Sequence, residues 1–214
     1  MATQCIASGR AQKVIVVGAD KMSSITNYQD RSTCILFGDA AGAVLVTACK
    51  GDESSYGIID TICKTDGGGQ CMLYQQAGGS RLPASHETID KQQHYVQQDG
   101  QGVFKAAVTH MSQAIIDIMA RNNLTAADIT YLVPHQANKR ILQAIAYRVG
   151  IPIEKVMINI DKYGNTTAAT LPLCLWEYEK KLKKGDKLIL SVFGGGFTWG
   201  ATYMIWGYDG SLKQ

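Results

Sequence analysis

A histidine and an asparagine are the residues of this chain whose types and surroundings could do chemistry. His135 follows the apolar residues 131–134, and Asn165 follows a glycine. Each side chain can donate a hydrogen bond, and two donors aimed at one thioester carbonyl oxygen would stabilise the charge that develops there. Glycines 194–196 add a turn where backbone N–H groups can approach a ligand closely. The combination indicates acyl-transfer chemistry.

Each of these features also has a structural alternative. His135 could be a core histidine at the end of a strand, and Asn165 could cap the N-terminus of a helix. The glycines 194–196 could simply form a hairpin turn. Taken one at a time, the structural alternative is favoured for His135 and Asn165.

Acyl transfer also needs a nucleophile, and the six cysteines provide no convincing one. Cys5 lies late in an expected helix, whereas activation of a thiol favours a helix N-terminus or a cationic neighbour. The cysteines lack CxxC spacing, several lie in apolar runs, and residues 1–5 do not resemble a signal peptide. We therefore expect buried, reduced thiols in a reducing compartment.

The composition indicates an ordinary globular protein. Of the 214 residues, 46% are apolar and 18% are charged. The formal net charge of +3 is too small to argue for nucleic-acid binding, although local basic patches could meet an acidic partner. No apolar run approaches the roughly 18 residues that a membrane-spanning helix needs.

The hydrophobic pattern predicts alternating strands and helices, which is typical of a layered α/β fold. The segment 66–100 is expected to be an irregular surface excursion. The last two strands should form an antiparallel hairpin, and Gly150 and Gly185 should end the two later helices. The predicted strands are 13–19, 43–48, 56–65, 131–133, 156–159, 187–192 and 198–206, and the predicted helices are 2–8, one from 103 onward, one ending at 149, and 165–184.

The chain is similar to a known enzyme family across six motifs, which occur from end to end in the family's order. These are DRST (30–33), FGDAAGA (37–43), GVFK (102–105), PHQANKR (134–140), GNT (164–166) and GGGFTWG (194–200). Together they resemble β-ketoacyl-acyl-carrier-protein synthase III, a thiolase-fold condensing enzyme that starts fatty acid synthesis. In this joint context catalysis becomes the favoured interpretation of His135 and Asn165.

The resemblance implies a thiolase-like layered fold, αβαβα when complete. Residues 1–50 would be the end of the first half and residues 51–214 the whole second half. The family's nucleophilic cysteine would stand shortly before Met1, so the resemblance predicts an N-terminally truncated chain that cannot condense by itself. Loss of most of the first half should expose apolar surface on residues 10–48.

The family transfers an acyl group, here expected to be acetyl, from coenzyme A to its cysteine. It then condenses that group with malonyl-acyl carrier protein, releasing carbon dioxide and giving a 3-oxoacyl product. The resemblance implies catalysis by His135 and Asn165 and an oxyanion-hole amide at Gly195. No cofactor is expected beyond the thioester substrates, and no metal.

Binding residues also follow from the resemblance. Arg31, Phe104 and Asn138 match positions that bind coenzyme A, and Lys105 and Arg140 match positions that dock the carrier protein. Lys139 could extend this basic rim or belong to a solvated helix face. The implied partners are acyl carrier protein and acyl-CoA, with a homodimer for the complete enzyme, and neither nucleic acid nor membrane.

Several alternatives and minor expectations accompany this interpretation. The chain could instead be a non-catalytic partner that binds carrier protein, or a related condensing enzyme of secondary metabolism. A cytoplasmic location is expected, or a plastid if the source cell has one.

Residues 37–42 are interpreted as tight packing between strands, because the full GxGxxG order is missing. His86, His94 and His110 lack metal-ligand spacing and are expected in loops or on the surface.

Overall fold

The computed structural model describes residues 1–49 and 55–210. The described helices are α1 (Ala2–Ala7), α2 (His86–Asp90), α3 (Gly100–Arg121), α4 (Lys139–Val149), α5 (Ile160–Tyr163) and α6 (Thr170–Tyr178). The described strands are β1 (Lys13–Asp20), β2 (Ala40–Thr47), β3 (Gly57–Thr65), β4 (Leu73–Gln75), β5 (Val96–Gln98), β6 (Tyr131–Pro134), β7 (Lys187–Gly194) and β8 (Thr198–Ile205).

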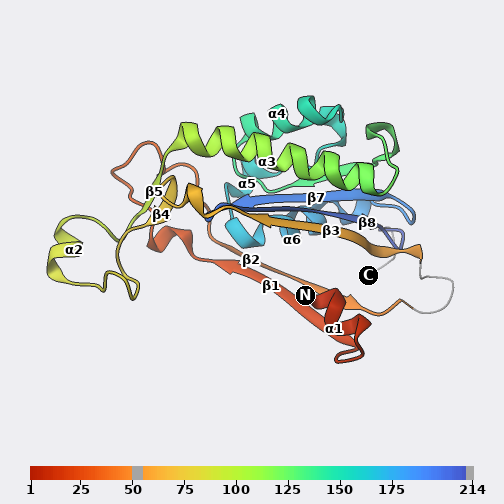
Figure 1. Cartoon of the computed structure of the whole chain (residues 1–214), viewed down its shortest axis with the longest axis horizontal. Helices are drawn as coiled ribbons and strands as arrows, with labels where there is room; N and C mark the ends of the chain where they lie inside the picture. Colours follow the sequence, from red (N-terminus) through yellow and green to blue (C-terminus); the bar gives the residue numbers. More distant parts are fainter. Residues whose placement is uncertain (50–54, 211–214) are drawn as a thin grey trace.

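The main sheet has the strand order β3-β8-β7-β6. β7 and β8 pair antiparallel, which confirms the predicted C-terminal hairpin, and β6 runs parallel to β7. Helices α3 and α4 cover one face of this sheet, and α6 lies on the other face, toward the β1–β2 hairpin (Figure 1). This alternation of helical and sheet layers confirms the predicted α/β class.

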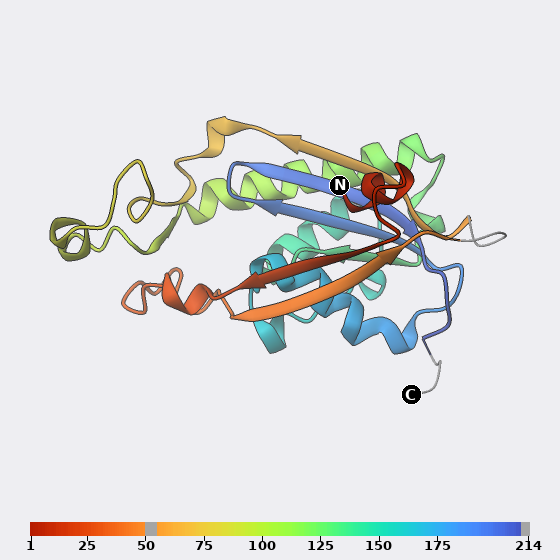
Figure 2. The same cartoon turned by 90° about the horizontal axis from the view of Figure 1, so that it is seen from below.

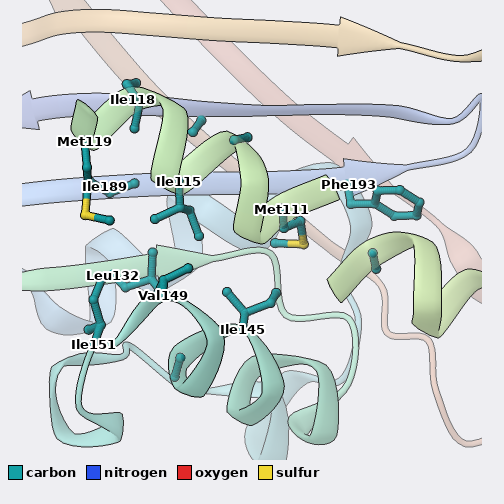
Figure 3. Packing of buried hydrophobic residues seen from close by; sticks show 14 of the residues in the cluster. Met111, Ile115, Ile118, Met119, Leu132, Ile145, Val149, Ile151, Ile189 and Phe193 are labelled. Atoms are coloured by element: carbon teal, nitrogen blue, oxygen red, sulfur yellow. The ribbon is translucent and has the colours of Figure 1, made fainter. Parts of the chain in front are cut away.

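The core forms on both faces of the main sheet because successive strand residues point to opposite sides. Leu132 and Ile189 face α3 and α4, whereas their neighbours Val133 and Leu188 face α6. Figure 3 shows the larger of the two clusters, which includes Met111, Ile115, Ile118, Ile145 and Val149.

Helices α3 and α4 form where caps and apolar periodicity agree. The Asp99 side chain accepts the N–H groups of Gln101 and Gly102 at the start of α3. Gly150 ends α4 in the left-handed region, with φ of 73°, as predicted. Within the described part of the chain, no helix combines the length and the apolar character needed to cross a membrane.

The β1–β2 hairpin packs closely on the turn and helix that follow Asn165. Gly18 and Gly42 are paired across it, and both face that segment. A Cβ atom on Gly18 would overlap the Ala168 carbonyl, and one on Gly42 would lie 2.6 Å from Cβ of Pro172. The segment 37–42 is therefore tightly packed, but against the later half rather than between strands. The predicted boundary at residues 50 and 51 lies outside the described residues.

The other face of the hairpin is exposed. Ile15, Val17 and Leu45 have exposed fractions of 68%, 65% and 59%. Figure 2 shows the hairpin nearest the viewer, with α1 beside one end. The expected apolar surface on residues 10–48 is therefore confirmed for these two strands.

The predicted strand 156–159 is wrong. Only Val156 makes a β-bridge, to Leu132, and the Met157 N–H donates to the Leu132 carbonyl. Two residues later the Asn159 N–H turns to the Gln136 side chain, so the chain leaves β6 before a strand can form.

The predicted helix 165–184 is also wrong, because the observed helix is shorter and starts later. The Asn165 N–H and carbonyl are both bonded to the segment 36–38, which leaves neither for a helix. Thr167 then adopts a positive φ of 48°. Helix α6 therefore begins only at Thr170 and ends at Tyr178.

The excursion 66–100 contains more structure than predicted. β4 and β5 pair antiparallel, and α2 begins with a capping box between Ser85 and Thr88. Apart from a 3-10 turn at Gly67–Gly69, the rest of this segment is irregular, as expected.

We expect Gly18→Ala to destabilise the fold, because the added methyl group would displace the backbone at Ala168. The free energy of unfolding from urea denaturation should fall by about 1–3 kcal/mol. Gly79→Ala is the control, since nothing lies within 4 Å of its Cβ position. Equal stability of the two variants would contradict the close packing.

Candidate active site

The largest concentration of predicted site residues surrounds a pocket of about 220 Å³. It lies between the first turns of α3 and α4, the end of β6, the loop before β2 and the Asn165 segment. Its walls are mostly apolar. The lining includes Thr33, Leu36, Phe37, Leu73, Val103, Phe104, His135, Asn138, Ile141, Asn165 and Phe193.

His135 enters the pocket from the end of β6. Its backbone N–H donates to the Ser191 carbonyl at 2.8 Å, which extends the β6–β7 pairing by one residue. The side chain is 9% exposed, and burial lowers its pKa to about 4. The imidazole is therefore neutral at neutral pH, with one N–H to donate. Among the described residues its ring nitrogens have no hydrogen-bond partner, so that N–H is available to a ligand.

Asn165 is held at the same pocket by hydrogen bonds of its backbone and of its side-chain oxygen. Its N–H donates to the Leu36 carbonyl at 2.8 Å, and its carbonyl accepts the Gly38 N–H at 2.9 Å. Its side-chain Oδ1 accepts the Thr167 N–H at 3.0 Å. This bond orients the amide so that Nδ2, which has no hydrogen bond to the described residues, is free to donate.

Asp20 supports the turn after Asn165 from the first part of the chain. Its Oδ2 accepts the Thr167 hydroxyl at 2.5 Å and the Ala168 N–H at 3.0 Å. Thr167 has a positive φ, and these bonds hold it there. Asp20 was not among the predicted site residues, because a residue at the end of β1 carries no local signal of a partner so far along the chain.

Four of the eight predicted site residues line the pocket, namely His135, Asn165, Phe104 and Asn138. Asn138 also caps α4, because its Oδ1 accepts the Arg140 N–H at 2.8 Å. The structure thus brings the two catalytic candidates together with two of the three residues matched to coenzyme A binding.

Gly195 does not line the pocket, although it lies beside it. A Cβ atom there would stand 3.4 Å from the carbonyl oxygen of Leu73, a lining residue. Its N–H has no backbone partner among the described residues. The role of this amide in an oxyanion hole stays a prediction.

Arg31, Lys105 and Arg140 are exposed and do not line the pocket. Each is adjacent in sequence to a lining residue, namely Ser32, Phe104 or Ile141. They therefore flank the pocket rather than form it, which fits binding to a large ligand outside. Their binding roles stay predictions.

None of the six cysteines lines the pocket. Cys174 is buried on α6, and burial raises the pKa of its thiol to about 12, which keeps it protonated and unreactive. All six cysteines are unpaired in the structure, but only Cys174 is buried. The expectation of generally buried thiols is wrong, because Cys49, Cys63 and Cys71 lie on exposed strand and loop positions.

The remaining histidines lie outside the pocket. Within residues 1–49 and 55–210, no group of histidine, cysteine and acidic residues is arranged to hold a metal ion. His110 was expected in a loop or on the surface, but it lies on α3, is partly buried and stacks on Trp199, with ring centroids 4.1 Å apart. Trp199 lies on β8, so this contact could not be read from local sequence.

Comparison with known proteins supports the family resemblance. The profile for 3-oxoacyl-(acyl-carrier-protein) synthase III matches residues 1–67, and the profile for the C-terminal part of that enzyme matches residues 119–206. A β-ketoacyl-(acyl-carrier-protein) synthase III from Phocaeicola vulgatus is 56% identical over 99% of this chain and 63% of its own. The chain belongs to the β-ketoacyl-acyl-carrier-protein synthase III family.

Solved structures agree with this assignment. The synthase III of Pseudomonas aeruginosa matches 96% of this chain and 62% of its own, with a TM-score of 0.85 and 36% identity. That of Thermus thermophilus has the same TM-score and 38% identity, covering 96% and 63%. These matches confirm the predicted thiolase-like fold. The chain spans about 63% of the length of the curated synthase III relatives it matches.

Burial of His135 should make stability depend on pH between 4 and 6.5. The unfolded chain protonates this histidine more readily than the folded chain does. The free energy of unfolding is therefore highest above pH 6.5 and falls as the pH drops toward 4. The full loss in the free energy of unfolding, reached below pH 4, is about 3 kcal/mol. Urea denaturation of wild type and His135→Gln should show a shallower pH slope in the variant, and identical slopes would contradict a buried neutral His135.

Proposed function

We propose that this chain carries the decarboxylating donors of a synthase III reaction. In that reaction an acyl-CoA, with acetyl-CoA as the expected donor, condenses with malonyl-acyl carrier protein to give 3-oxoacyl-acyl carrier protein. The observation that supports the proposal most is the placement of His135 and Asn165 in one pocket, each with a free N–H donor.

The chemistry follows from those two donors. When the malonyl carboxylate leaves as carbon dioxide, its carbon–carbon bond breaks and the electron pair moves onto the thioester as an enolate. The developing enolate oxygen would accept hydrogen bonds from the His135 imidazole and the Asn165 amide. One such preorganised donor is worth about 2.7–4 kcal/mol in the transition state.

The low pKa of His135 suits this role. A neutral imidazole donates to the enolate oxygen without transferring its proton completely, and burial keeps it neutral across the physiological range. The mostly apolar lining lowers the polarity around the donors, which strengthens their electrostatic effect.

Acyl transfer and condensation need a further group, a thiol that carries the acyl chain. The enolate carbon would attack the acyl carbon of that thioester, form the new carbon–carbon bond and release the thiolate. Because none of the six cysteines lines the pocket, we propose that this chain alone does not complete that half of the reaction.

The rim of the pocket supports acyl carrier protein as the partner. Lys105, Lys139 and Arg140 are exposed beside it, and none of them takes part in an ion pair among the described residues. Free cations of this kind attract an acidic surface or the phosphates of coenzyme A. The same rim would serve the second candidate function, a chain that binds carrier protein without turnover.

The free thiols agree with a reducing compartment such as the cytoplasm.

Purified chain given malonyl-acyl carrier protein and acetyl-CoA should release carbon dioxide without forming acetoacetyl product. His135→Ala with Asn165→Ala should reduce carbon dioxide release at least about 100-fold, because both enolate donors are lost. Release would be followed with labelled malonyl carboxylate and product by mass spectrometry. Equal release by the double variant would refute the donor role, and robust acetoacetyl product would refute the incomplete condensation.

Charge reversal at the rim should weaken the carrier protein complex. We expect Arg140→Glu to raise Kd about tenfold, which corresponds to about 1.4 kcal/mol. Arg148→Glu is the matched control, because Arg148 is exposed in the last turn of the same helix. Isothermal titration calorimetry at two salt concentrations measures the Kd of both variants for the carrier protein. If the two variants bind alike, Arg140 does not dock the carrier protein, whereas tight binding without any carbon dioxide release would favour the non-catalytic candidate.

A further inference from the structure

Gln136 lies between the two catalytic candidates in the sequence. It makes several buried hydrogen bonds, and the proposed reaction assigns no role to them. It directly follows His135, it is only 1% exposed, and it does not line the pocket. A buried polar side chain is costly unless all of its hydrogen bonds are made. The Gln136 amide makes four.

These four bonds use the full capacity of a carboxamide on both sides. Nε2 donates to the carbonyls of Pro134 at 2.9 Å and Met157 at 3.0 Å. Oε1 accepts the N–H groups of Asn159 at 3.0 Å and Ile160 at 3.2 Å. Two carbonyls on one side and two N–H groups on the other fix the orientation of the amide, because a flipped amide would lose every bond.

The contacts of Gln136 reach both ends of the segment that carries Asn165. Asn159 and Ile160 lie where α5 begins, just before Asn165. At the other end, the Gln136 backbone N–H donates to the Thr170 hydroxyl at 2.8 Å, where α6 begins. The residue that follows His135 therefore holds the segment 159–170 at its start and at its finish.

We propose that Gln136 is a positioning residue that sets the His135 imidazole and the Asn165 amide in one geometry. It does not touch the pocket, so it acts through the two segments that it joins. The inference rests on the proposed function, since it assumes that the two donors act on one oxygen atom.

Other residues cannot replace Gln136 in this network. Glutamate has the same length, but as a carboxylate it would place negative charge against the carbonyls of Pro134 and Met157. Methionine fills a similar volume and makes none of the four bonds. The two substitutions therefore separate the shape of the side chain from its hydrogen bonding.

The experiment compares Gln136→Met with wild type in two measurements. Carbon dioxide release from malonyl-CoA should fall about 100-fold in kcat with little change in KM, because a misplacement of about 1 Å can cost that much. In NMR titrations, which need no turnover, the pKa of His135 should rise from about 4 toward 6.5 as its segment loosens and water enters.

The control variant is Ile129→Ala, which removes a fully buried side chain just before β6, at the end remote from His135. It should lower stability while leaving the His135 pKa near 4. A folded Gln136→Met with wild-type His135 titration overturns the proposal, as does an equal pKa shift in Ile129→Ala. If wild type and His135→Ala with Asn165→Ala release carbon dioxide alike, the proposed function fails, and the His135 titration alone decides the role of Gln136.

Gln136→Glu provides a second test if the methionine variant does not fold. Burial raises the pKa of a carboxyl group, and below that pKa the introduced carboxylic acid can donate one of the two bonds that the Nε2 group made. The Asn165 side-chain amide signal should then shift with pH in the glutamate variant and stay constant in wild type. The same pH response in both proteins would overturn the proposal.

Discussion

The pairing of Asn165 with the segment 36–38 is the constraint on which the pocket depends. Two backbone hydrogen bonds, of 2.8 and 2.9 Å, join residues that are far apart in sequence. They remove the Asn165 backbone from any helix and leave its side chain at the pocket. Asp20 and the close approach of Gly18 to Ala168 hold the same turn. The first part of the chain therefore shapes a site whose catalytic candidates both belong to the second.

Burial of His135 sets the protonation state of the site and also reduces the stability of the fold at low pH. The apolar walls around His135 keep the imidazole neutral, so that one ring N–H can donate a hydrogen bond. The same desolvation destabilises the fold whenever the histidine would be protonated in the unfolded chain. The fold tolerates this cost because the surrounding strands, especially the β6–β7 pairing, hold the His135 backbone independently of its side chain.

Local signals predicted the elements that are stabilised locally. α4 was predicted from its periodic apolar face and Gly150, and the β7–β8 hairpin from two β-rich runs around a glycine turn. The strand 156–159 and the helix 165–184 were predicted from the same kind of signal and are wrong. In both segments, hydrogen bonds from distant residues, Gln136 and the segment 36–38, replaced the local pattern.

The sequence by itself determined the family, the layered α/β class and the identity of the residues that can donate hydrogen bonds, because these depend on residue types and motif order. Only the tertiary structure decided that His135, Asn165, Phe104 and Asn138 share one pocket, while Arg31, Lys105 and Arg140 flank it. It alone decided the neutral state of His135 and the connecting role of Gln136. Desolvation and buried hydrogen bonds arise from neighbours that are distant along the chain, and no local pattern encodes them.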